Sequence, residues 1–226
     1  MMNRLKKLDG TTLKLIAMLS MAFDHIGDAF FPDQIWMRAI GRLAMPIFAF
    51  CVAEGFVHTR DRKKYLLRLG LFACISELPF DLFSSGRLNL THQNIMFTFF
   101  WAILALLCYE KLTVGGGRKR YVIGVLVLLA FTGTSVLLRL DYNLLGVGLV
   151  ILFYLLREKG PLLRIGAAMV YHTLLRNMGV YWFGLLGFLP ILLYNGQKGK
   201  GLKWLFYVFY PVHLLLIFLI KRYLCA

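Results

Sequence analysis

The chain has 226 residues, of which 59% are apolar and only 16% are charged. Soluble domains usually contain about 45–50% apolar residues, so this composition excludes an ordinary soluble protein. The net charge of +15 does not indicate nucleic-acid binding, because the basic residues lie between apolar runs and no zinc-finger or RNA-binding motif is present. The sequence therefore predicts a single membrane-embedded domain over residues 1–226, with the lipid bilayer as its surroundings.

Apolar stretches of transmembrane length follow one another along the whole chain. A helix needs about 20 residues to cross a bilayer, within a range of about 17–25. The nine candidate spans are 12–31, 36–58, 64–84, 95–112, 121–138, 143–157, 162–177, 180–195 and 203–223. The pair 162–177 and 180–195 is short enough to form a re-entrant hairpin instead, which gives about eight to ten spans. The predicted fold class is an all-α, polytopic transmembrane helical bundle.

The distribution of lysine and arginine predicts the orientation. Loops on the cytoplasmic side of a membrane carry an excess of these residues. With nine alternating spans and a cytoplasmic N-terminus, 19 of the 26 basic residues fall on the inside. The inside set includes Arg4 and Lys6 before the first span and Lys14, Arg68, Lys198, Lys200 and Lys203 at span ends. We therefore expect the N-terminus in the cytoplasm.

The first predicted span ends in the stretch FDHIGDAFF, residues 23–31. An ionisable group inside a span costs about 2.5–3.5 kcal/mol on insertion scales and usually marks function. Asp24 and Asp28 are four residues apart, and His25 and Asp28 three apart, so each pair can meet on a helix. We expect Asp28 to accept a hydrogen bond from one ring nitrogen of His25, leaving the other as a base. Gly27 is expected to let another helix or a ligand approach closely. Asp28 is equally compatible with an ordinary helix end in the headgroup region.

The second and third spans carry further charges in what the topology predicts as the outer half. Arg38 and Arg42 share a helix face, and they either pair with carboxylates of neighbouring spans or bind an anionic substrate. Glu77 and Asp81 are also four residues apart; they either share one proton or stay ionised beside an arginine. Pro46, near the start of the second span, is expected to disturb the helix.

Polar groups elsewhere are weaker candidates. Asn94, Asp141 and His213 are possible substrate contacts, although a lone histidine such as His213 is more typical of a hydrogen-bonded structural group. The basic stretch after the second span can hold cofactor phosphates, although the positive-inside rule already accounts for it; its residues are Arg60, Arg62, Lys63 and Lys64. Glu54 is expected to pair with this basic stretch. The histidine spacing of zinc proteases is absent, and no metal site is predicted.

Several long motifs resemble those of the TraX family of integral membrane proteins. These include DHIG at 24–27, PIFAFCVAEGFVHTR at 46–60 and SELPFD at 76–81, and the resemblance continues over nearly the whole chain. The founding member of that family acetylates the N-terminal amine of F-type pilin in the bacterial inner membrane. The family is also similar to wider groups of multi-span acyltransferases, which have an essential histidine within the membrane.

The resemblance implies an activity and a location. It implies a multi-pass protein of the bacterial cytoplasmic membrane that transfers an acetyl group from cytoplasmic acetyl-CoA to an acceptor on the far side. The acceptor is a pilin, another envelope protein, a glycan or a lipid. The essential histidine then corresponds to His25, with Asp24 and Asp28 orienting it or tuning its pKa. The proline motif matches at Pro46, and the acidic motif at Glu77 and Asp81.

Two other functions fit the same residues. In a proton-coupled transporter, Asp24, His25, Glu77 and Asp81 would form an ion pathway, although the internal repeat common in transporters is not visible. In a non-catalytic membrane assembly factor, the buried acids would contact a partner protein.

Overall fold

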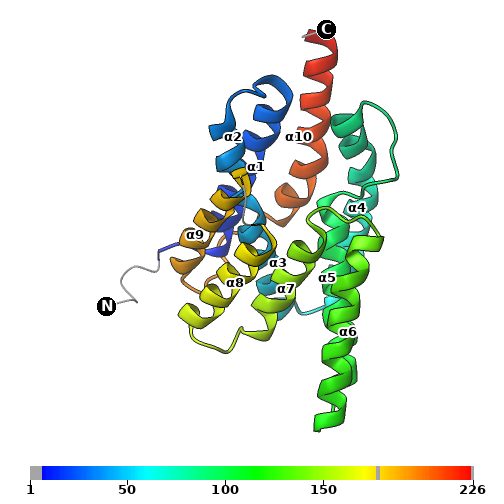
Figure 1. The fold of residues 1–226 in the computed structure, drawn as a ribbon, viewed down its shortest axis with the longest axis vertical. Coiled ribbons are helices and arrows are strands. Elements are labelled where there is room, and N and C mark those ends of the chain that lie inside the picture. Colours follow the sequence, from blue (N-terminus) through cyan, green and yellow to red (C-terminus); the bar gives the residue numbers. More distant parts are fainter. Residues whose placement is uncertain (1–6, 177–178, 225–226) are drawn as a thin grey trace.

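The computed structural model describes residues 7–176 and 179–224, and this part of the chain is built from helices (Figure 1). The first half contains α1 (Gly10–Phe30), α2 (Ile35–Gly41), α3 (Ala44–His58), α4 (Arg62–Ser85) and α5 (Ile95–Thr113). The second half contains α6 (Arg118–Leu137), α7 (Asn143–Leu155), α8 (Pro161–Leu175), the 3-10 helix η2 (Gly179–Gly187), α9 (Phe188–Leu192) and α10 (Lys203–Leu224).

Each predicted span coincides with one helix or with two consecutive ones. The all-helical fold class is thus confirmed, and helices α2 with α3 and η2 with α9 fill two of the predicted ranges. Within the described residues, four helical stretches are long and apolar enough to cross a membrane: Ile35–His58, Ile95–Thr113, Arg118–Leu137 and Lys203–Tyr223. Two of the basic residues that predict the orientation, Arg4 and Lys6, lie outside the described residues. The same holds for residue 177 of the seventh predicted span.

Short polar side chains mark where helices begin. Asp9 caps α1 by accepting a hydrogen bond from the Thr12 backbone N–H at 2.7 Å, and this bond lowers the pKa of Asp9. Asp61 caps α4 in the same way through the Lys64 backbone N–H at 2.9 Å. Helix α4 ends at Ser85 and is followed by Gly86, whose φ of 69° is the left-handed conformation common after a helix C-terminus.

A break between α2 and α3 follows from Pro46. Proline has no backbone N–H, so the carbonyl of Arg42 loses its normal helical partner. The chain leaves regular α-helix at Arg42 and Leu43 and resumes it at Ala44. The expected disturbance by Pro46 is therefore confirmed, and it places Arg42 at the junction of two helices.

The helices expose large apolar side chains outward and pack through small residues inside. On α4, Leu67 is 68% exposed and Leu71 58% exposed, as expected for side chains that face lipid. A Cβ atom at Gly27 would lie 2.8 Å from Cβ of Met37, so only glycine allows α2 to lie this close to α1. The close approach predicted at Gly27 is confirmed.

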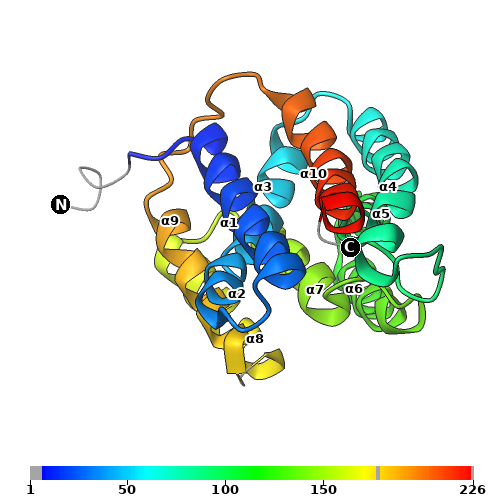
Figure 2. The same ribbon diagram turned by 90° about the horizontal axis from the view of Figure 1, so that it is seen from above.

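The last helix lies beside the first. Viewed from above, α10 lies between α1 and α4 (Figure 2), and it packs against both of them. Residues from the two ends of the chain therefore line the same interior. Polar side chains of α1 can contact polar side chains of α10 there.

Candidate functional site

A cavity of about 680 Å³ extends along the inside of the bundle, between α1, α3, α4 and α10. Ligand pockets commonly have about 300–1,000 Å³. His25 lines the cavity near the end of α1, and Lys14 lines it near the start of the same helix. Since an α-helix rises 1.5 Å per residue, these two positions are about 17 Å apart along the axis. The cavity therefore connects two chemically different ends of the bundle.

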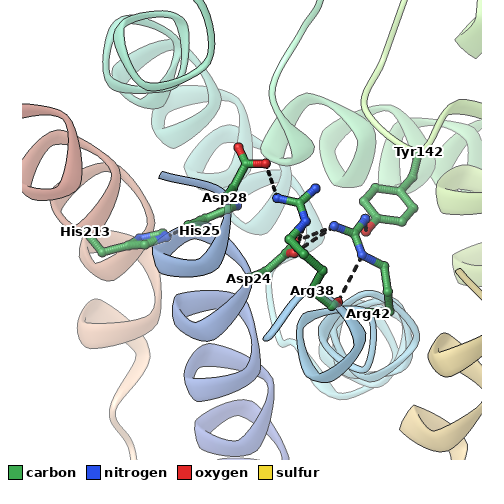
Figure 3. A network of polar contacts seen from close by, with 7 residues as sticks. All are labelled: Asp24, His25, Asp28, Arg38, Arg42, Tyr142 and His213. Atoms are coloured by element: carbon green, nitrogen blue, oxygen red, sulfur yellow. Dashed lines mark hydrogen bonds and ion pairs between the residues drawn. The ribbon is translucent and has the colours of Figure 1, made fainter. Parts of the chain in front are cut away.

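At the His25 end, two aspartates and two arginines form a compact charge cluster (Figure 3). Both carboxylate oxygens of Asp24 accept hydrogen bonds from Nη2 of Arg42, at 2.8 and 2.7 Å. Nε of Arg38 lies 3.2 Å from Oδ1 of Asp24, and Nη1 of Arg38 pairs with Asp28. Of the two roles predicted for the arginines, pairing with first-span carboxylates is therefore the one that the structure shows.

The chain around Arg42 is built to hold this cluster. Gly41 lies directly against Asp24, because a Cβ added at Gly41 would be 2.2 Å from Cβ of Asp24. Arg42 also donates to the Tyr142 hydroxyl at 3.0 Å, and the Tyr181 ring lies 5.1 Å from its guanidinium carbon. Tyr142 has a φ of 55°, which is uncommon for a tyrosine. These contacts fix Arg42 from several sides.

His25 faces away from the charge cluster, toward α10 (Figure 3). Its Nδ1 lies 2.7 Å from Nε2 of His213, and the two rings are nearly parallel, with centroids 5.0 Å apart. The predicted hydrogen bond between Asp28 and His25 is wrong, because Asp28 pairs with Arg38 instead. His213 does not line the cavity, so it lies behind His25 and not at a substrate surface as predicted.

Glu77 and Asp81 have different surroundings from Asp24 and Asp28. The Asp81 carboxylate accepts from the Asn89 backbone N–H at 2.8 Å, and Glu77 accepts from the backbone and side-chain N–H groups of Asn94. Neither acid lines the cavity. Both acids hold the loop between α4 and α5, so the structure does not bring these predicted catalytic residues to the cavity that His25 lines.

Asn94 is also a structural residue. It is fully buried, its carbonyl oxygen accepts from the Met96 backbone N–H at 2.9 Å, and its Nδ2 donates to the Ala73 carbonyl at 2.9 Å. It thus caps α5 and joins it to α4. The expectation that Asn94 binds substrate is not met, because its amide is occupied inside the protein and does not line the cavity.

Asp141 does line the cavity, next to Tyr142. Its carboxylate lies 3.8 Å from Nε2 of His92 in the loop between α4 and α5. This neighbouring carboxylate raises the pKa of His92. Asp141 therefore remains a candidate substrate contact, with His92 beside it.

At the opposite end the cavity is lined by four basic residues: Lys14, Arg68, Lys198 and Lys203. None of the four forms an ion pair within residues 7–176 and 179–224. Nε of Arg68 is buried and has no hydrogen-bond partner there. We call these four residues the basic mouth; its free donors suit an anionic group.

The stretch predicted to hold cofactor phosphates lies elsewhere. None of Arg60, Arg62, Lys63 and Lys64 lines the cavity. Arg62 pairs with Glu110, and Lys64 pairs with Asp61 at 3.5 Å. Glu54 pairs with Arg164 of α8 at 2.7 Å and lies 3.8 Å from His58, so its main partner is not the basic stretch that follows it. The structure therefore does not bring the predicted phosphate-binding residues to the cavity.

Three features of the site were missed from the sequence. The basic mouth joins residues of α1, α4 and α10 with one from the loop before α10, and each had been assigned to topology only. Tyr142, the hydroxyl partner of Arg42, follows Asp141 directly, and that proximity was the available signal. The pairing of His25 with His213 has no local signal, because 188 residues separate them.

Taken together, the fold and the site define a helical membrane protein with a buried charged cluster, a histidine pair and an internal cavity. The family model described as "TraX protein" matches residues 9–221. The chain therefore belongs to the TraX family.

Among curated proteins, the chain is similar to "Probable fimbrial assembly protein FimC, serogroup H1" of Dichelobacter nodosus. The two are 30% identical over 242 residues, which covers 94% of this chain and 95% of the relative. A shorter match, 46% identical over 44 residues, links 20% of this chain to 18% of "Uncharacterized protein RP591" of Rickettsia prowazekii (strain Madrid E). No solved structure matches.

Proposed function

We propose that this protein is a multi-pass membrane acyltransferase. It takes an acetyl group from acetyl-CoA at the basic mouth and passes it to an acceptor at the His25 end of the cavity. The observation that carries the proposal is the cavity itself, which joins unpaired cations at one end to a histidine at the other. Membership of the TraX family supports the same activity.

The residues at the basic mouth fit the donor. Coenzyme A carries phosphate groups at one end and a thioester on a narrow, flexible arm at the other. Phosphates pair well with lysine and arginine, and the roughly 17 Å between Lys14 and His25 suits an extended arm.

The residues of the basic mouth belong to the set predicted on the cytoplasmic side. We thus place the N-terminus in the cytoplasm of a bacterial cell, with nine helical segments crossing its inner membrane.

His25 supplies the chemistry. It acts as the general base that takes a proton from the acceptor amine or hydroxyl as that group attacks the thioester carbonyl carbon. A new C–N or C–O bond forms, the C–S bond breaks, and the electron pair leaves with the sulfur of coenzyme A. General base catalysis of this kind contributes about 10²–10⁴-fold in rate. The charge cluster keeps Arg38 and Arg42 in place beside the reacting groups.

The acceptor is proposed to be the N-terminal amine of a pilin-like subunit. The relative from Dichelobacter nodosus is named as a probable fimbrial assembly protein, and it aligns with this chain almost from end to end. Acetylation removes the positive charge of an amine, which alters how neighbouring subunits pack.

Purified protein in lipid nanodiscs tests the activity. It would be given radiolabelled acetyl-CoA together with peptides from the N-termini of the pilins of the same cell. We expect labelled peptide, and a loss of at least about 100-fold in His25→Ala. Leu19→Ala in the same helix is the control, since the Leu19 side chain is exposed and does not line the cavity. Equal rates in His25→Ala and the wild type would remove His25 from the mechanism.

The donor site has its own test. Lys14→Gln and Arg68→Gln are expected to raise the dissociation constant of coenzyme A by about tenfold each, the loss of one charge-assisted contact. Lys63→Gln, an exposed lysine outside the cavity, serves as the control. A larger effect from Lys63→Gln than from Lys14→Gln would return the donor site to the basic stretch.

The continuous cavity also favours a second candidate, a proton-coupled transporter. Flux of a small molecule into proteoliposomes without an acyl donor would support this function over acyl transfer. A non-catalytic assembly factor is distinguished from both by normal maturation of pili in cells that carry Asp24→Asn together with His25→Ala.

A further inference from the structure

The hydrogen bonds of His25 and His213 determine which of their ring nitrogens carry hydrogen. Nδ1 of His213 is 2.8 Å from the carbonyl oxygen of Phe209, one turn earlier in α10. A carbonyl oxygen only accepts hydrogen bonds, so Nδ1 of His213 carries a hydrogen. The neutral ring has one N–H and one lone pair, and its lone pair is then on Nε2.

The position of the hydrogen on His213 determines which ring nitrogen of His25 carries a hydrogen. Nε2 of His213 lies 2.7 Å from Nδ1 of His25. Because Nε2 of His213 accepts, Nδ1 of His25 must donate, and it carries the hydrogen of that ring. The lone pair of His25 is therefore on Nε2. That atom has no hydrogen-bond partner among the described residues, and His25 lines the cavity.

Packing holds the two rings in this arrangement. The Phe209 ring stacks on His213 at 4.5 Å between centroids, and the Phe83 ring lies 5.0 Å from His25. The nearby carboxylates of Asp24 and Asp28 are paired with arginines. A second proton on His213 would therefore be a buried charge without a carboxylate partner, which is unfavourable.

We propose that His213 is a positioning residue, which holds His25 in the Nδ1–H tautomer so that the Nε2 lone pair faces the cavity. Its catalytic meaning rests on the proposed acyl transfer, whereas the tautomer stands on the hydrogen bonds alone. When Nε2 of His25 takes the proton of the acceptor, the resulting charge is stabilised through Nδ1–H by Nε2 of His213. Nε2 then returns the proton to the departing thiolate, and both rings are restored.

The tautomer can be measured without any substrate. The chain has five histidines, so ring ¹⁵N spectra of the full-length protein in nanodiscs are simple, and His25→Ala assigns the His25 signals. We expect a protonated Nδ1 and an unprotonated Nε2 at His25 in the wild type. In His213→Leu, which removes the acceptor, we expect this preference to be lost. An Nε2–H tautomer in the wild type, or an unchanged spectrum of His25 in His213→Leu, would overturn the proposal.

Substitutions separate positioning from mere packing. In His213→Gln, the side-chain carbonyl can accept from His25 in place of Nε2, whereas the shorter His213→Asn places its amide near the position of Nδ1. We expect kcat to fall at least about tenfold in His213→Leu and His213→Asn, with KM for acetyl-CoA within about twofold. His213→Gln should recover most of kcat and the wild-type tautomer.

The positioning role of His213 and the acyl transfer can be contradicted separately. If His213→Leu does not fold, the His213→Gln and His213→Asn pair still decides the question, and equal kcat values in that pair would contradict the positioning role. If no acyl transfer is found in the wild type, the proposed function fails, while the ¹⁵N spectra still decide the tautomer.

Discussion

Two pairs of carboxylates with the same spacing have opposite surroundings in this protein. Asp24 and Asp28 line the cavity and pair with Arg38 and Arg42. Glu77 and Asp81 lie away from the cavity and hold the loop that precedes α5. The spacing only tells which side chains share a helix face. The residues packed against that face determine whether a buried acid lines the cavity or holds a loop in place.

The sharpest way to test this contrast is to remove Asp24. Asp24→Ala leaves Arg42, whose side chain is 8% exposed, without its carboxylate. Removing one partner of a buried ion pair costs about 3–5 kcal/mol, and we expect that loss in the free energy of unfolding in detergent micelles. The double variant Asp24→Ala with Arg42→Met should recover part of it. A double variant that is less stable than Asp24→Ala would contradict the pairing.

The contact between Gly41 and Asp24 gives the next largest effect. Gly41→Ala places a methyl group 2.2 Å from Cβ of Asp24, and we expect it to cost about 3 kcal/mol, since overpacking typically costs 1–3. Gly133→Ala in α6 is the matched control, because a Cβ there meets open space. It should leave stability unchanged or raise it by up to about 1 kcal/mol. Equal melting temperatures for the two variants would disprove the close contact.

The other acidic pair should affect stability without affecting catalysis. Asp81→Ala leaves the Asn89 backbone N–H without its acceptor, and we expect a loss of about 1–2 kcal/mol. The kcat of acyl transfer should stay within about twofold of the wild type, because Asp81 does not line the cavity. A fall in kcat comparable to that of His25→Ala would return Asp81 to the catalytic residues.

The smallest expected effect is a pH dependence at the loop that Glu77 and Asp81 hold. Asp141 raises the pKa of His92 in the folded protein, so this pair stabilises the fold fully below the unfolded pKa near 6.5. The contribution is lost as the pH rises through the higher folded value. Since His92 is about half exposed, we expect less than about 1 kcal/mol. His92→Gln should remove this part of the pH dependence in thermal melts at pH 6 and pH 9.

Local patterns in the sequence were enough to locate the helices and part of the site. Apolar runs predicted the helical ranges, and Pro46 predicted the break before α3. The charges at Asp24 and Arg42 were found because each is anomalous within an apolar run. The position of Glu77 and Asp81 away from the cavity could not be predicted, because their partners, Asn89 and Asn94, are set by the path of a loop. The partner of His25 could not be found because it lies at the other end of the chain.

The packing of α10 against α1 sets the order in which the site forms during synthesis. Asp24 and Arg42 are 18 residues apart, so at about 5–20 residues per second their pair becomes available within about 1–4 s. His25 and His213 are 188 residues apart, and the same rates give about 10–40 s. The charges of α1 thus gain their partners soon after synthesis, whereas His25 gains its partner His213 only when the chain is nearly finished.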